Sequence, residues 1–164
     1  MEPIFHVIIP SLLLMAFFPQ INKRTVIITG FIVEFMMDFD SLFGVEWHRI
    51  LTHNIIWAAM VGLIFLAIKG KAWARPAWFF AFTHLLFDLR DFGVALFWPF
   101  IQKTFALYIT ISESNPWFFK IEPKAFSFEE LHAAVYPWTL LDSWGAYIII
   151  AIALMLLYKF WKRK

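Results

Sequence analysis

Apolar residues run along the chain in five long stretches, separated by polar and charged segments. A membrane helix needs about 20 mostly apolar residues, and fewer where protein shields its ends. The pattern therefore predicts an all-α integral membrane protein, a five-transmembrane-helix bundle that forms a single membrane domain over residues 1–164. The predicted helices cover about residues 3–19, 25–37, 51–68, 72–89 and 138–160.

The segment 90–137 is the one sizeable stretch outside the predicted helices. Its sequences "FALYITIS" and "NPWFFKIEP" are rich in β-branched and aromatic residues and lie on either side of a turn-like "SESNP", which predicts a strand pair. In the following "SFEELHAAVYP", Ser127 and Glu130 have the spacing of a capping box, which predicts a short helix. We expect this insert to form an extracytoplasmic flap.

The composition agrees with a membrane protein. Hydrophobic residues make up 62% of the chain, against about 45–50% in soluble domains. The 21 phenylalanines and 9 tryptophans fit lipid contact and interfacial belts, so membrane lipid is the expected partner. The absence of cysteine excludes disulfides and thiolate metal ligands. A net charge of +2 is too small to indicate a nucleic-acid partner.

The basic residues are unevenly distributed between the two sides of the predicted bundle. Nine of the 14 lysines and arginines follow the first, third and fifth apolar stretches, in "NKR", "KGKAWAR" and "KFWKRK", with no acidic residue among them. By the positive-inside rule this side is cytoplasmic. The sequence thus predicts a multi-pass protein of the cell membrane with its N-terminus outside and its C-terminus inside.

Histidines and carboxylates gather at the opposite ends of the same helices. Glu34 and Asp38 share one helical face, and so do His84 and Asp88, because side chains four residues apart lie one turn apart. Each has an ordinary structural interpretation when taken singly: a packed histidine or a helix cap. His6, Asp91, His132 and Asp142 are the residues for which this ordinary interpretation competes most directly.

Taken together, the polar residues point to a metal ion. Ionisable groups within apolar helices cost several kcal/mol unless they are compensated. Five carboxylates (Glu34, Asp38, Asp40, Asp88 and Asp91) face only Arg49 and Arg90 as nearby cations. A divalent cation would correct this imbalance. Imidazole and carboxylate ligands suit zinc best, with manganese or iron as alternatives. His84 and Asp88, with His53 and either Asp38 or Asp40, could hold one ion or two.

The same residues carry a resemblance to a known family. "DFDSLF…HRILTHN" followed by "HLLFDLRDFGVALFWPF" resembles the YdjM-like family of membrane-bound metal-dependent hydrolases, over residues 6 to 99. That family's pattern has a histidine in the first helix, an aspartate pair after the second, HR..TH at the third and H...D in the fourth. The resemblance implies a site formed by His6, Asp38, Asp40, His48, Arg49, His53, His84 and Asp88.

The order of these residues is also similar to that of the zinc-dependent phospholipase C and single-strand nuclease superfamily, whose members cleave phosphodiesters. Those enzymes carry a later HxxxE pair. Here the only later histidine is His132, and the residue four positions on is Tyr136. Asn54 also stands where the YdjM-like pattern has a serine.

The predicted activity is hydrolysis of a phosphoester in a lipid or lipid-linked substrate at the outer leaflet. The metal would activate water, Arg49 would bind a phosphate oxygen, and His48 would protonate the leaving group or act as a ligand. Asp40 or Glu34 is the candidate general base. The alternative is a membrane protein that binds or transports metal ions or protons through the same cluster. The substrate, the number of ions and the oligomeric state stay open.

Overall fold

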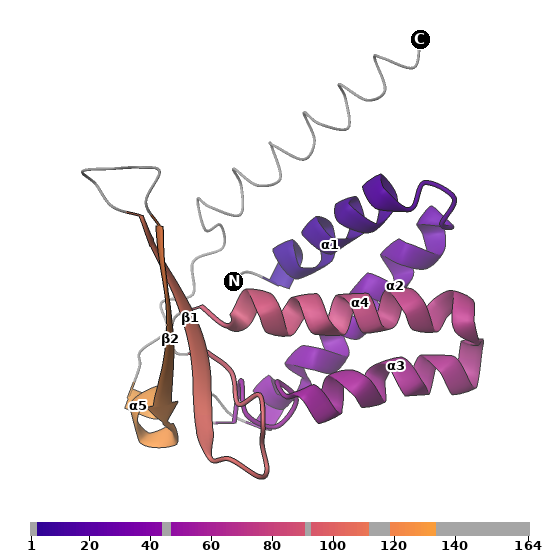
Figure 1. Cartoon of the computed structure of the whole chain (residues 1–164). Coiled ribbons are helices and arrows are strands. Elements are labelled where there is room, and N and C mark those ends of the chain that lie inside the picture. The colour runs from indigo at the N-terminus through magenta and orange to yellow at the C-terminus, as the bar shows by residue number, and fades with distance from the viewer. Residues whose placement is uncertain (1–2, 44–46, 91–92, 112–118, 134–164) are drawn as a thin grey trace.

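The computed structural model describes residues 3–43, 47–90, 93–111 and 119–133. Four helices form a bundle: α1 (Pro3–Phe17), α2 (Lys23–Met37), α3 (Ile55–Lys69) and α4 (Lys71–Asp88). Helix α4 contacts each of the other three, and α2 also packs on α1 (Figure 1). A short 3-10 helix, η1 (Asp38–Phe43), continues directly from α2. The predicted helix at 138–160 lies outside the described residues.

The predicted transmembrane bundle is wrong for the described part of the chain. None of its helices is both long enough and apolar enough to cross a membrane. Helices α1, α2 and α3 have 15 residues each, about 22 Å at 1.5 Å per residue, against a hydrocarbon core of about 30 Å. Helix α4 has 18 residues but contains Lys71, Arg75 and Asp88. The orientation inferred from the charges depended on such spans and stays a prediction.

An antiparallel strand pair follows the bundle, so the description as all-α is also wrong. Strand β1 (Lys103–Ile111) pairs with β2 (Phe119–Ser127), with Lys103 opposite Ser127 and Ile111 opposite Phe119. Helix α5 (Phe128–Ala133) comes next. Its capping box is present: the Ser127 amide donates to Glu130 Oε2 at 2.6 Å, and the Glu130 amide donates to Ser127 Oγ at 3.2 Å.

Asparagine caps determine where two of the helices begin. The side chain of Asn22 accepts a hydrogen bond from the Thr25 amide, and that of Asn54 accepts one from the Trp57 amide. Because Asn54 is extended and serves as the N-cap, α3 begins at Ile55, four residues later than the apolar pattern suggests. The polar residues just before α3 are therefore in a loop that is free to turn toward the other helices.

Helices α2 and α4 approach closely at Gly30. A Cβ atom at this position would lie 2.8 Å from Phe80 Cζ, inside van der Waals contact. Phe80 is buried with Val26, Val33 and Ala77 in the main hydrophobic core. One turn beyond this contact, Glu34 on α2 faces His84 on α4. The missing side chain at Gly30 thus allows the helix approach that forms part of the polar site.

Candidate metal centre

The polar side chains predicted from the sequence converge at one end of the bundle. This end combines the N-terminal part of α1, the C-terminal ends of α2 and α4, η1 and the loop before α3 (Figure 1). His53 and Asp40 are fully buried there, and His6, His84 and Asp88 are nearly so. Asp38 is the most accessible of the carboxylates, with a quarter of its side chain exposed, so the site opens toward solvent beside Asp38.

Two aspartate oxygens lie close to a pair of facing histidine nitrogens. His53 Nε2 lies 3.0 Å from His84 Nε2, 3.4 Å from Asp38 Oδ1 and 3.4 Å from Asp88 Oδ2. His84 Nε2 lies 3.5 Å from Asp38 Oδ1 and 3.4 Å from Asp88 Oδ2. Tetrahedral zinc with ligand bonds of about 2.0–2.1 Å separates its ligand atoms by about 3.3–3.4 Å. Each aspartate oxygen therefore lies at a distance from both histidine nitrogens that suits ligands of one ion.

The other ring nitrogen of each histidine faces a carboxylate. His53 Nδ1 lies 3.0 Å from Asp40 Oδ2, and His84 Nδ1 lies 3.0 Å from Glu34 Oε2. An ionised carboxylate only accepts hydrogen bonds, so in this arrangement the ring protons are on Nδ1. Nε2 of each ring is then the nitrogen left to bind an ion, and both Nε2 atoms lie beside the Asp38 and Asp88 oxygens. A carboxylate behind each imidazole is a regular feature of metal-bound histidine.

Asp40 is held in place from several directions. Its carboxylate accepts a hydrogen bond from the Thr52 amide at 3.3 Å and lies 3.2 Å from His48 Nδ1, in addition to its contact with His53. The Thr52 hydroxyl donates to the Met37 carbonyl, which ties the loop before α3 to the end of α2. The structure thus places Asp40 behind His53, where it positions the ring.

His6 lies beside the four-atom site, which is formed by Asp38 Oδ1, His53 Nε2, His84 Nε2 and Asp88 Oδ2. Its Nδ1 atom is 2.7 Å from His84 Nδ1, and its Nε2 atom is 3.4 Å from Asp88 Oδ1. His6 Nε2 is buried and forms no hydrogen bond. Asp88 therefore presents one oxygen to the four-atom site and the other to His6. This pair offers two further ligand atoms, fewer than a complete coordination set.

Arg49 enters the site from a strained backbone position. Its φ of 70° is in the left-handed region, which is uncommon for residues other than glycine. The Arg49 carbonyl accepts a hydrogen bond from the Ala95 amide at 3.0 Å, which links this turn to the segment before β1. Arg49 Nη2 lies 3.8 Å from Asp88 Oδ1. The guanidinium thus lies near the carboxylate of Asp88. One oxygen of that carboxylate faces His6, and the other faces His53 and His84.

Comparison with known proteins identifies the family of the chain. The family model for the YdjM inner membrane protein matches residues 1–164, the whole chain. The chain belongs to this family. No curated protein and no solved structure matches it. The family resemblance seen in the sequence is confirmed, and the family description places its members in the inner membrane without naming a reaction.

The electrostatics of this family member show strongly coupled acids and bases. Burial works to lower the pKa of His53, but hydrogen bonds to carboxylates outweigh it and hold the pKa well above its usual value. In the same way the pKa of His84 rises to about 9 despite burial, through bonds to Asp88 and Glu34. Burial raises the pKa of Glu34 to about 7.

The pKa values of Asp88 and His6 are both lowered, but for different reasons. Burial works to raise the pKa of Asp88, yet His6 and hydrogen bonds from the other imidazoles bring it well below its usual value. Burial lowers the pKa of His6 to about 3, which keeps its ring neutral and able to act as a ligand. Protons on His53 and His84 offset the negative charge of the carboxylates. A divalent cation would supply that positive charge in their place.

The structure brings together every site residue named from the sequence, which are Glu34, Asp38, Asp40, His48, Arg49, His53, His84, Asp88 and His6. Asp91 and Asp142 lie outside the described residues, and the side chain of His132 in α5 is not described. Thr52 was missed. Its position directly before His53 is the one sequence signal that could have suggested its role in anchoring the loop.

Proposed function

We propose that this protein is a metal-dependent hydrolase that cleaves a phosphoester of a lipid or lipid-linked substrate. The observation that carries the proposal is that Asp38 Oδ1 and Asp88 Oδ2 each lie within 3.5 Å of both His53 Nε2 and His84 Nε2, with a carboxylate behind each imidazole. Protons on the two imidazoles offset the carboxylates when no ion is bound, and a divalent cation would take their place. Two imidazoles and two carboxylates at this spacing favour zinc.

The residues divide into ligands and supports. Asp38, His53, His84 and Asp88 are the proposed ligands, while Asp40 and Glu34 orient the two histidines. This replaces the expectation that Asp40 or Glu34 is a general base, because both are engaged by imidazole protons. His6 and the second oxygen of Asp88 are the ligands available to a second ion.

The reaction class follows from the accompanying cation and from the family. A bound zinc ion supplies Lewis acidity that activates water and polarises the substrate. The guanidinium of Arg49 suits a phosphate oxygen because its planar fork matches the geometry of the anion. His48 is partly exposed beside Asp40 and is the candidate proton donor to the leaving group. An inner membrane family makes a lipid phosphoester the favoured substrate.

The metal is tested first by purifying the full-length protein without chelators and measuring its metal content by mass spectrometry. We expect about one equivalent of zinc per chain and loss of most of it in His84→Ala. Thr83→Ala is the matched control, because the Thr83 hydroxyl bonds only carbonyls of its own helix among the described residues. A wild-type protein that stays metal-free when zinc is supplied would overturn the proposal.

The reaction is tested separately, with phospholipids in mixed micelles and phosphate-containing product as the readout. We expect zinc-dependent turnover in the wild type, and in Arg49→Gln a fall of at least tenfold with the metal retained. Zinc flux into proteoliposomes without turnover on any phospholipid would instead favour the transport alternative.

A further inference from the structure

Among the described residues, the charged side chains at the end of the bundle opposite the metal centre are all basic. Lys23 and Arg24 begin α2, Lys69 ends α3, and Lys71 and Arg75 lie in the first turns of α4, all of them exposed. Residues 3–33 and 55–83 contain no aspartate or glutamate. Within the described chain none of these five cations forms an ion pair, so their charge is available to an anionic partner.

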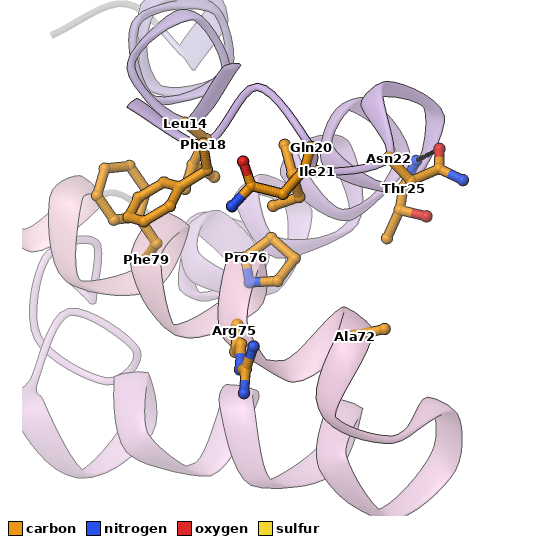
Figure 2. A pocket seen from close by; sticks show the side chains of 10 residues that line it. All are labelled: Leu14, Phe18, Gln20, Ile21, Asn22, Thr25, Ala72, Arg75, Pro76 and Phe79. Atoms are coloured by element: carbon orange, nitrogen blue, oxygen red, sulfur yellow. Dashed lines mark hydrogen bonds between the residues drawn. The ribbon is translucent and has the colours of Figure 1, made fainter. Parts of the chain in front are cut away.

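A pocket of about 490 Å³ opens at this same end, between the α1–α2 turn and the beginning of α4. This volume is in the range of small-molecule sites. Its walls are mainly apolar and include Leu14, Phe18, Ile21, Pro76 and Phe79. Figure 2 shows the Phe18 and Phe79 rings close together on one side, with Pro76 near the middle.

Four polar side chains also line the pocket: Gln20, Asn22, Thr25 and Arg75. Arg75 lines it from α4, and Asn22 and Thr25 lie on the other side, away from the phenylalanine rings (Figure 2). Gly70 precedes α4 and offers no side-chain cap. The first amides of α4 therefore add partial positive charge beside Lys71 and Arg75. An apolar chamber with a cationic rim suits a ligand with a hydrocarbon tail and a negative head.

We propose that this pocket binds an anionic phospholipid, with an acyl chain among Leu14, Phe18 and Phe79 and the headgroup phosphate at Arg75 and Lys71. Two observations favour a lipid over a free anion or a protein. The pocket walls are hydrocarbon, which a free phosphate does not need. Phe17 and Ile68 are 73% and 69% exposed near the same end, beside the lysines and arginines. Apolar side chains flanked by basic ones are typical of surfaces that bind anionic membranes.

The lipid would contact α4 at its beginning, whereas His84 and Asp88 contact the metal centre near its end. The proposed lipid site is therefore separate from the hydrolytic site and does not depend on it. Its function would be to hold this end of the bundle at an anionic membrane surface.

The test uses the full-length protein in non-ionic detergent. Dioleoyl phosphatidylglycerol or dioleoyl phosphatidylcholine is titrated in, and bound lipid is counted by native mass spectrometry. We expect several-fold tighter binding of the anionic lipid. Arg75→Gln and Lys71→Gln should each weaken it about fivefold, as expected for one basic group near a headgroup. Ala72→Trp, which narrows the pocket without changing charge, should weaken it as well.

Two matched controls separate the site from general effects. Lys103→Gln removes an exposed cation from β1, and Ala67→Trp adds an indole to the exposed face of α3 outside the pocket. Both should bind phosphatidylglycerol as the wild type does, and unchanged thermal unfolding midpoints show that the variants fold. Equal binding of the two lipids, full binding by Ala72→Trp, or equal competition by inorganic phosphate would each overturn the proposal.

Discussion

At the scale of single residues, identical side chains take different roles because of what lies behind them. Asp38 and Asp40 are two positions apart, yet Asp38 is a quarter exposed and faces both Nε2 atoms, while Asp40 is fully buried behind His53. His53 and His84 each use one nitrogen toward the proposed ion and the other toward a carboxylate. Ligand and support are therefore distinguished by geometry, and both are needed to fix the site.

Replacing each aspartate by asparagine tests this distinction. In Asp40→Asn the four ligand atoms stay, but His53 loses its negatively charged support, so zinc affinity should fall about 10- to 100-fold while full occupancy returns with excess zinc. Asp38→Asn removes a charged ligand oxygen and should weaken zinc binding further. Competition with a zinc-binding dye of known affinity measures both constants. Equal losses in the two variants would contradict the assignment.

The residue set could be predicted from the sequence, but the roles could not. Helical spacing paired His84 with Asp88 and Glu34 with Asp38, since i and i+4 positions share a face. It left Asp38 and Asp40 as alternatives for the same ion, because a residue beyond the end of a helix has no fixed direction. The hydrogen bond from the Thr52 amide helps to hold Asp40 behind His53. Thr52 is in a loop, so helical periodicity does not predict this contact.

At the scale of elements, the boundaries of α2 and α4 fall within two residues of the apolar pattern, whereas the start of α3 does not. The difference arises because Leu51 is apolar but belongs to the loop that ends at the N-cap Asn54, so hydrophobicity alone extends the helix too far. The prediction that these helices span a membrane was also wrong, because overall apolar composition says little about the length of each helix. The close approach at Gly30 was missed, since a glycine within an apolar helix gives no sign of its partner.

Gly30→Ala should destabilise the protein through its contact with Phe80. The added methyl group gains about 1 kcal/mol of helix propensity, but overpacking in a core costs about 1–3 kcal/mol, so a net loss of about 1 kcal/mol is expected. Phe80→Leu should partly relieve the clash. Denaturant unfolding of both single variants and the double variant should show a coupling of at least about 0.5 kcal/mol. Additive changes would show that the two residues do not determine the helix separation.

At the scale of the whole molecule, the two ends of the bundle have opposite chemistry. One end gathers the carboxylates and imidazoles, and the other gathers lysines and arginines around an apolar pocket. The sequence predicted this segregation because the helices alternate in direction, which brings every second connection to the same end. The pocket could not be predicted, since its walls come from α1, α4 and the turn between α1 and α2.

The metal centre should also stabilise the fold, because its proposed ligands come from η1, the loop before α3 and the end of α4. A ligand that binds only the folded state at 100 times its dissociation constant adds about 2.7 kcal/mol. Removing zinc with a chelator should therefore lower the thermal unfolding midpoint by several degrees, and adding zinc back should restore it. His84→Ala should unfold at the same temperature with and without zinc, whereas Thr83→Ala should respond as the wild type does. A zinc-dependent shift that persists in His84→Ala would place the stabilising ion elsewhere in the chain.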